Sequence, residues 1–431
     1  MPIPFLSSIA RAAGRLRKSS PRRREVQADQ PAQAGARDPT TNVSVYLDGL
    51  PQAKAEVRDH FKEGQRLQAA ERHEAAIGEF EKALTSADNE RQRCALHILI
   101  GNSFSDLDRL SEAEGHYRQA LEAAERAGDR EGQAVALGNL GLVYRQRGEL
   151  DKAEEYYTKA LTIFEDIGDR LGQANQLGGL GIVYFERGDL DGAEQHHQKA
   201  LAMHREIGNR RAQAHALSNL GIVYGERGEF SKAEEYHRNA LAIHQKVDSR
   251  LGQASDHSSL GNVYFRRGEL DRAEEHYRKA LAIFEEIGNP LGQAIDLGNL
   301  GLVAERRGEL DKAEEHHKKA LAIHEKIGNR LGQAETLGNL GLVYARRGEL
   351  DKAEEHFKKA LAIDEEIGNK LGEARDLGNM ALLQAQAGNA AEAVHHLRKA
   401  RRIFAEAGAS ADVKKTDELM ARLEAGSPPK P

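Results

Sequence analysis

The sequence predicts an all-α protein, an α-solenoid made of nine helix-turn-helix repeats and closed by a C-terminal capping helix. First, the text LGNLGLVYARRGELDKAEEHFKKALAIDEEIGNK at 337–370 recurs nearly unchanged from 297, 257, 217, 177 and 137. Second, its apolar residues recur at helical spacing in two stretches separated by glycine. Third, a hairpin of two short helices cannot bury its apolar face alone, so the repeats must stack on one another.

A small–aromatic–small pattern at i, i+4 and i+7 sets the register of the repeats. The first step is 37 residues and every later step is 40. The nine copies are Ala76/Phe80/Ala83, Ala113/Tyr117/Ala120, Ala153/Tyr157/Ala160, Ala193/His197/Ala200, Ala233/His237/Ala240, Ala273/Tyr277/Ala280, Ala313/His317/Ala320, Ala353/Phe357/Ala360 and Ala393/Leu397/Ala400. The constant step indicates one array, not several separate globular domains.

Each repeat is predicted to hold two helices of about 17 residues, or roughly 25 Å each at 1.5 Å per residue. Gly348 and Gly368 are expected to end the two helices of one repeat, because the left-handed conformation costs glycine little. Asn369 then stands where a helix N-cap belongs. The dipeptide Asn289–Pro290 supports the same phase, with a capping residue before a proline at the first helical position.

The chain is divided accordingly into four segments. Residues 1–50 are a predicted disordered arm, 51–407 the array, 408–425 the capping helix and 426–431 a disordered tail. Residues 1–24 carry seven basic residues and no acid. Three interpretations of this arm stay open: a solvated arm, a basic amphipathic helix on an anionic membrane, and an organelle presequence.

Composition excludes several classes of protein. The net charge is −6, and without residues 1–24 the remaining 55 basic and 68 acidic residues leave −13, which disfavours nucleic-acid binding. The single cysteine, Cys94, excludes an intramolecular disulfide and a cysteine zinc cage. No apolar run approaches 18 residues, so membrane contact is expected only through the arm, and the expected location is the cytoplasm.

No reactive or cofactor site is predicted. No GxxxxGK[ST] motif occurs, and the histidines of the second helices are spaced i+1 and i+7, which does not place two rings on one ion. The repeated glutamates stand beside lysines at i+4, as on a solvated helix face. We therefore expect neither catalysis, metal nor cofactor. At Gly338 and its equivalents Gly138, Gly178, Gly298 and Gly378, either a partner's backbone approaches or the helices only pack closely.

The repeats resemble the tetratricopeptide repeat. The signature maps onto Leu337, Leu340–Gly341, Tyr344, Ala353, Phe357 and Ala360. Two departures are a leucine for the usual first aromatic and the loss of the usual proline late in the second helix. The 40-residue variant is similar to the repeats of LGN/Pins spindle-orientation adaptors and of kinesin light chain. The resemblance implies a right-handed superhelix whose first helices line a concave binding face.

On that face we expect three sets of partner-binding residues. An asparagine ladder offers a donor and an acceptor in each copy and comprises Asn139, Asn219, Asn299, Asn339 and Asn379. A row that changes sign comprises Glu186, Glu226, Arg266, Arg306 and Arg346. Phe185 and Phe265 add aromatic rings.

The predicted function is a non-catalytic scaffold or adaptor that grips an extended peptide or a helix of a partner protein in its groove. The alternatives are a self-assembling homo-oligomeric scaffold and a peptide-sensing array that acts on an enzyme in trans. Three departures from the repeat, His257 for leucine, Asp248 for glycine and Ala304 for tyrosine, are either drift or marks of a hinge, a pocket and a specificity site.

Overall fold

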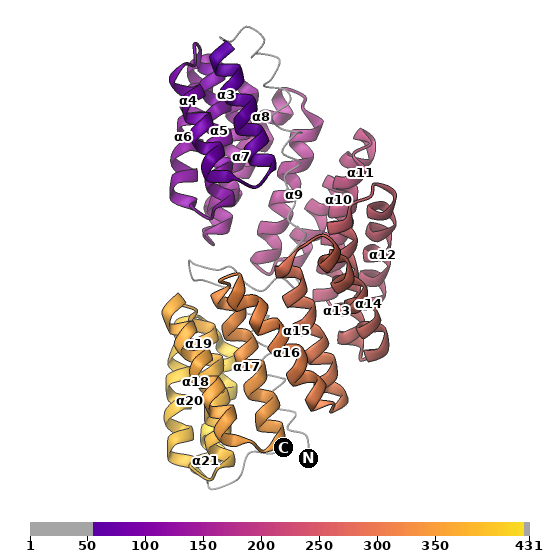
Figure 1. Cartoon of the computed structure of the whole chain (residues 1–431), viewed down its shortest axis with the longest axis vertical. Helices are drawn as coiled ribbons and strands as arrows, with labels where there is room; N and C mark the ends of the chain where they lie inside the picture. Colours follow the sequence, from indigo (N-terminus) through magenta and orange to yellow (C-terminus); the bar gives the residue numbers. More distant parts are fainter. Residues whose placement is uncertain (1–54, 426–431) are drawn as a thin grey trace. The chain divides into compact units, whose positions relative to one another are not determined.

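The computed structural model describes residues 55–425. The predicted arm 1–50 and tail 426–431 lie outside these residues. The described chain forms 19 α-helices and no strand, and consecutive helices lie side by side as antiparallel hairpins (Figure 1). It divides into two compact units between Val223 and Tyr224, inside helix α11 (Arg210–Glu226). The prediction of an all-α repeat solenoid is confirmed.

The N-terminal unit, 55–223 of the described residues, contains four hairpins and most of α11. Its hairpin helices are α3 (Ala55–Ala69), α4 (His73–Thr85), α5 (Glu90–Asp106), α6 (Leu110–Ala127), α7 (Arg130–Gln146), α8 (Leu150–Asp166), α9 (Arg170–Glu186) and α10 (Leu190–Ile207).

The C-terminal unit, 224–425 of the described residues, begins with the last turn of α11 and with α12, continues with four hairpins and ends with a single helix. Its helices are α12 (Phe230–Lys246), α13 (Arg250–Arg267), α14 (Leu270–Glu286), α15 (Pro290–Arg307), α16 (Leu310–Lys326), α17 (Arg330–Arg347), α18 (Leu350–Ile367), α19 (Lys370–Gln386), α20 (Ala390–Glu406) and α21 (Ser410–Glu424).

Helix ends follow the local sequence signals. Gly348 ends α17 in the left-handed conformation, with φ 80°, and Gly368 ends α18 with φ 71°. The side chain of Asn369 accepts a hydrogen bond from the backbone N–H of Gly372 at 3.2 Å, which caps α19. Asn289 caps α15 in the same way, and Pro290 is its first residue. At Asp248 a non-glycine residue adopts the left-handed conformation, with φ 50°.

In most hairpins the core forms where an aromatic ring of the second helix enters the space above a glycine of the first, whereas the last hairpin has Ala381 and Leu397 at these positions. Phe357 is buried between Ala353 and Ala360. A Cβ atom on Gly341 would lie 2.6 Å from Cε1 of Phe357, so only glycine leaves room for the ring. Glycine has a low helix propensity, and the packing of the Phe357 ring over Gly341 offsets this loss of helix stability.

A polar clasp joins several hairpins to the next, and where Ala304 replaces its tyrosine, Arg307 still binds Glu274. The hydroxyl of Tyr344 donates to Glu314 at 2.7 Å, and the guanidinium of Arg347 binds the same carboxylate. Glu314 belongs to one hairpin, whereas Tyr344 and Arg347 belong to the following one. The same three-residue clasp, with sequence separations of 30 and 33, recurs at Glu114/Tyr144/Arg147, Glu154/Tyr184/Arg187 and Glu234/Tyr264/Arg267.

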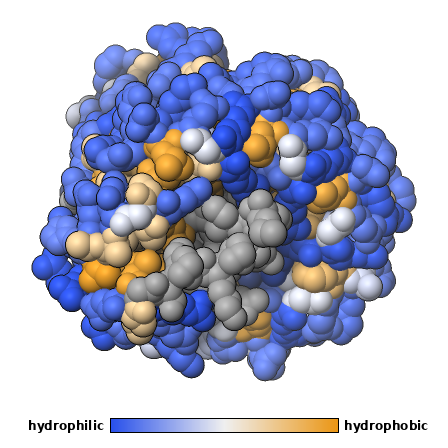
Figure 2. Space-filling model, turned by 90° about the horizontal axis from the view of Figure 1, so that it is seen from below, coloured by the Kyte–Doolittle hydropathy of each residue, from blue (hydrophilic) through white to orange (hydrophobic). Residues whose placement is uncertain are grey.

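Helix α21 covers the last hairpin within the stretch 408–425. Its Leu419 and Leu423 are buried against Val394 and Leu397 of α20. The face drawn in Figure 2 is mostly hydrophilic, with hydrophobic residues in small separate groups. Among the helices of residues 55–425, none combines the length and the apolar character that a membrane crossing requires.

Candidate functional site

The charged residues predicted to bind a partner lie in the last turn of each first helix. We call the following set the last-turn row: Arg145 of α7, Phe185 and Glu186 of α9, Glu226 of α11, Phe265 and Arg266 of α13, Glu305 and Arg306 of α15, and Arg346 of α17. Each of these residues lies within the last three residues of its helix, so successive copies occupy the same level of their hairpins. Arg267, Arg307 and Arg347, the next residues along, point to the preceding hairpin and bind its clasp glutamate.

In the N-terminal unit the row forms one ion pair between neighbouring hairpins. The Nη1 atom of Arg145 lies 2.8 Å from Oε1 of Glu186, and the two side chains are only 14% and 20% exposed. Sequence reasoning had singled out Glu186 but not its partner, because the two residues are 41 positions apart. The half-buried Phe185 precedes Glu186 on the same turn.

In the C-terminal unit three arginines reach back to the hairpin before them. Arg266 lies 2.7 Å from the carboxylate of Glu226. The guanidinium of Arg306 stacks over the ring of Phe265, 3.9 Å from its centroid, and donates to the Phe265 carbonyl oxygen at 2.8 Å. Arg346 lies 3.2 Å from the carboxylate of Glu305.

The predicted sign change along the row is therefore present, but most of its charges already have partners from the row itself. Glu186, Glu226, Arg266 and Arg346 each form an ion pair. Arg306 is the exposed arginine of the three, and its guanidinium is positioned by the ring and the carbonyl oxygen of Phe265. Because it is the most accessible of the three, Arg306 is the best placed to meet an incoming carboxylate.

A buried acid in this row was not predicted. Glu305 is 6% exposed, and its Oε1 atom lies 3.0 Å from Nε2 of the fully buried His317. In the N-terminal unit the corresponding positions hold Arg145, Tyr157 and Glu186, so the acid and the arginine have exchanged places. The exchange of glutamate and arginine between near-identical repeats was the sequence signal that could have predicted the buried acid.

The asparagine ladder is not uniformly accessible. Asn139 and Asn339 are half-buried, whereas Asn219, Asn299 and Asn379 are buried. The amide of Asn299 donates to Asp296 at 3.3 Å. Neither amide atom of Asn219 has a hydrogen-bond partner among the described residues. The half-buried members are thus the ones that reach solvent.

The other mid-helix glycines differ in what lies above them. A Cβ atom on Gly138 would lie 2.7 Å from the side chain of Gln176, and one on Gly338 would lie 3.4 Å from Asp376, both of which belong to the next hairpin. At these two positions the neighbouring hairpin uses the space. Above Gly298 and Gly378 nothing lies within 4 Å. The hypothesis of an approaching partner backbone therefore applies best to Gly298 and Gly378.

Two of the departures singled out in the sequence, Ala304 and His257, have distinct surroundings. Ala304 is buried and packs against Ala313 and Val343. His257 is half-buried and faces His276 of the same hairpin, with the two Nδ1 atoms 3.0 Å apart.

The buried thiol of Cys94 has its pKa raised to about 12 by burial, which makes it unreactive. Within residues 55–425, no group of three or more His, Cys, Asp or Glu side chains is arranged to hold a metal ion.

Two family descriptions match this geometry of repeated hairpins. Residues 214–426 match the MalT-like TPR region, and residues 91–166 and 173–246 match the tetratricopeptide repeat. The chain belongs to the tetratricopeptide repeat family. The comparison with curated proteins gives no match.

Solved structures of tetratricopeptide proteins share the fold. A signal transduction ATPase with numerous domains and a tetratricopeptide repeat sensor, from Pyrococcus horikoshii, is 15% identical with a TM-score of 0.61, over 97% of this chain and 66% of its own. The apo form of the quorum sensor NprR from B. thuringiensis is 14% identical with a TM-score of 0.60, over 85% and 99%. A Rap protein complexed with competence and sporulation factor is 15% identical with a TM-score of 0.54, over 86% and 99%.

Proposed function

We propose that the chain is a protein-interaction scaffold that binds an extended acidic peptide segment of a partner along the last-turn row of its C-terminal unit. The observation that carries this proposal is the recurrence of Arg266, Arg306 and Arg346 at one position of three successive hairpins. An extended peptide runs along such a row and meets one guanidinium per hairpin. Arginine suits this role because its planar fork binds a carboxylate through two hydrogen bonds.

The row also offers groups that orient a peptide. The half-buried Asn339 supplies an amide donor and acceptor for a peptide backbone on the same helix as Arg346. The ring of Phe265 holds the Arg306 guanidinium in place, which lowers the entropy lost on binding. In the N-terminal unit the single acid–base pair Arg145–Glu186 gives no comparable run of like charge, so the acidic peptide is assigned to the C-terminal unit.

A peptide-sensing array that acts on an enzyme in trans is the second candidate. Two fold relatives support it, a quorum sensor and a Rap protein complexed with competence and sporulation factor. In both candidates the chain binds a peptide and supplies no catalytic group. They differ in whether the bound peptide changes the activity of another protein.

The test is a titration of the full chain with two fluorescein-labelled peptides, one rich in glutamate and one rich in lysine, followed by fluorescence anisotropy. The Arg306→Glu variant is expected to bind the glutamate-rich peptide about five- to tenfold more weakly, as expected for a charge reversal at an accessible site. The matched control is Arg278→Glu, which reverses an arginine of the second helix α14 that is 60% exposed and paired with Glu274.

Equal affinity of the wild type for the two peptides, or an equal loss in both variants, contradicts the proposal. Arg266→Glu and Arg346→Glu are less informative as tests of peptide binding, because each change also breaks an ion pair within the chain. Arg266 is paired with Glu226, and Arg346 is paired with Glu305. Light scattering of the free chain separates peptide binding from self-assembly, since only self-assembly produces a particle mass that grows with protein concentration.

A further inference from the structure

Two hairpins bring a pair of histidines face to face, one from each helix. His97 of α5 lies opposite His116 of α6, and their Nδ1 atoms are 3.1 Å apart. In the C-terminal unit His257 of α13 lies opposite His276 of α14, and the Nδ1 atoms are 3.0 Å apart. The four rings are half-buried. Both pairs have the same sequence separation of 19 and the same pairing of nitrogens, although they belong to different units.

The first-helix histidine is the distinctive member of each pair. Later repeats with the 40-residue step hold leucine at this position, as at Leu137, Leu177 and Leu337, except at His257. In two hairpins with leucine on the first helix, the histidine on the second helix uses Nδ1 locally. The Nδ1 atom of His196 lies 2.8 Å from the carbonyl oxygen of Gly192, and that of His356 lies 2.8 Å from the carbonyl oxygen of Lys352.

The paired histidines instead direct Nδ1 at each other across the hairpin. Burial, together with the neighbouring ring, lowers the pKa of His97 and of His257 to about 4, and burial lowers the pKa of His276 to about 4. The imidazoles are therefore neutral at neutral pH, the form in which histidine binds metal ions. When both rings carry their proton on Nε2, both Nδ1 lone pairs face the space between the two rings, and no proton has to leave the protein.

We propose that the pairs His97/His116 and His257/His276 are each a two-nitrogen site for a divalent transition-metal ion of the Cu(II) or Ni(II) class. At a metal–nitrogen length of about 2.0–2.1 Å, nitrogens 3.0 Å apart subtend an angle of roughly 90–100° at the ion. This angle suits the square or tetragonal geometry of Cu(II) and Ni(II) better than a tetrahedral site. Water fills the remaining positions, because the rings are open to solvent on one side.

The charges around the pairs decide how tightly an ion is held. Beside His276, the carboxylate of Glu275 is paired with Lys279 at 2.6 Å, so the two charges offset each other. Arg93 and Arg126 act on His97, and their positive charge weakens binding at that pair. The first hairpin places His60 against Glu79 at 2.7 Å, but Lys82 is also bound to Glu79. Arg238 and Arg272 act in the same sense on His276, so the surrounding charges favour neither pair over the other.

The experiment is an isothermal titration of the full chain with CuCl₂ and, separately, with NiCl₂. The double variant His97→Leu/His257→Leu places at both positions the residue that other repeats use there, so the hairpins are expected to fold. It is expected to bind two ions fewer per chain than the wild type, and His257→Leu alone to bind one fewer. The control His356→Tyr removes an unpaired second-helix histidine and introduces the residue found at Tyr156 and Tyr236.

Electron paramagnetic resonance of the Cu(II) complex gives a readout that packing alone does not affect. The expected spectrum shows hyperfine coupling to two imidazole nitrogens, and this signal disappears in the double variant. His276→Tyr, which changes the other ring of the C-terminal pair, must remove the same ion as His257→Leu. An unchanged number of bound ions in the double variant, or an equal loss in the His356→Tyr control, means that the pairs are hydrogen bonds only and overturns the proposal.

Discussion

Glu305 and His317 form a buried pair within the C-terminal unit, with Oε1 of the acid 3.0 Å from Nε2 of the ring and side chains 5% and 0% exposed. The other carboxylate oxygen of Glu305 faces Arg346 at 3.2 Å. The acid thus ties the last-turn row to the aromatic position of the hairpin core. At the same core position the buried His197 has no hydrogen-bond partner for either ring nitrogen among the described residues.

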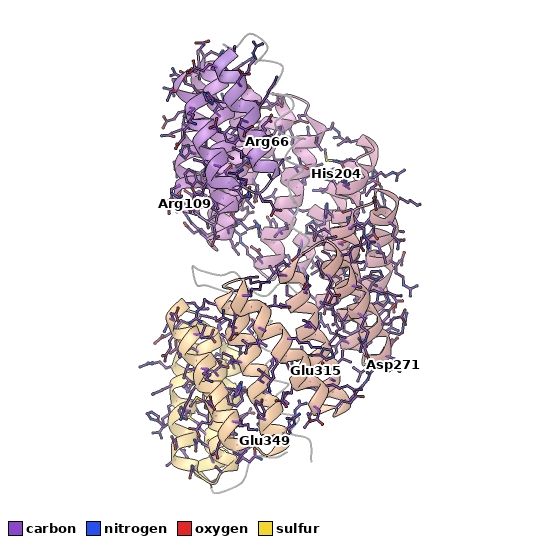
Figure 3. The ribbon with its side chains drawn as sticks, viewed as in Figure 1. Arg66, Arg109, His204, Asp271, Glu315 and Glu349 are labelled. Atoms are coloured by element: carbon purple, nitrogen blue, oxygen red, sulfur yellow. The ribbon has the colours of Figure 1, made fainter. Side chains whose placement is uncertain are left out.

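Removal of this acid is expected to destabilise the C-terminal unit. In Glu305→Ala a ring nitrogen of His317 loses its partner in a buried place, and the free energy of unfolding should fall by about 1–3 kcal/mol. Urea denaturation followed by circular dichroism measures the change. Glu315→Ala is the control, because Glu315 is 62% exposed and only pairs with Lys319 along the helix (Figure 3). An equal loss of unfolding free energy in the two variants would show that the buried pair stabilises the unit no more than the exposed pair does.

Two glycines one turn apart in α15 are expected to respond in opposite ways to alanine. A Cβ atom on Gly301 would lie 2.5 Å from Cε1 of His317, so Gly301→Ala should destabilise the unit by about 1–3 kcal/mol. Above Gly298 nothing lies within 4 Å, so Gly298→Ala should stabilise it by up to about 1 kcal/mol through helix propensity. The same urea experiment measures both.

Gly298→Ala also tests whether a partner backbone approaches this helix. If it does, the variant is more stable but binds the glutamate-rich peptide more weakly. Unchanged peptide affinity together with higher stability would assign Gly298 to no binding role.

The buried Asp296 is expected to make the C-terminal unit less stable as the pH rises. Burial raises its pKa to about 7, although Ser258 donates a hydrogen bond to it at 2.8 Å. Between about pH 4 and pH 7 the folded state keeps a proton that the unfolded chain has lost, so stability falls across this window. Asp296→Asn removes the titration and should stabilise the unit by about 1–3 kcal/mol at pH 8, with a smaller gain at pH 5.

The buried His197 should produce the opposite slope in the N-terminal unit. Burial lowers its pKa to about 3. Below about pH 6.5 the unfolded chain binds a proton that the folded state does not, so stability is lost as the pH falls. His197→Phe uses the residue of two other repeats and should gain about 2 kcal/mol more at pH 5 than at pH 8. His395→Phe, at an exposed position, is the control, and a similar gain there would refute the burial argument.

The hairpins could be predicted because their signals are local. The cap at Asn289–Pro290 and the terminator Gly348 each involve residues within one turn of the helix end, and both are confirmed. The repeat signature contains both Gly341 and Phe357, and the structure shows that the ring of Phe357 fills the space above Gly341. The aromatic position occupied by His197 and His317 is buried, as its place in the repeat required.

The contacts between hairpins could not be predicted from one repeat. Arg145 and Glu186 are 41 residues apart, and neither position has a fixed residue type in the other repeats. Periodicity places both on the same helix face but does not tell whether they point to solvent or to each other. The partner-binding roles of the row and of the asparagines remain predictions for the same reason.

The clasp of glutamate, tyrosine and arginine has a consequence for how such a gene can change in length. Since its members are always 30 and 33 positions apart, removal of 40 consecutive residues within the run from Glu234 to Arg347 brings together ends that still supply a matching acid and guanidinium, and also the phenol where the joined copy carries Tyr344 and not Ala304. Unequal recombination between the near-identical coding copies would thus yield shorter or longer chains in which the acid and the guanidinium of each junction are still matched. Natural isolates are expected to vary in copy number by whole multiples of this period more readily than by point substitution at the junctions.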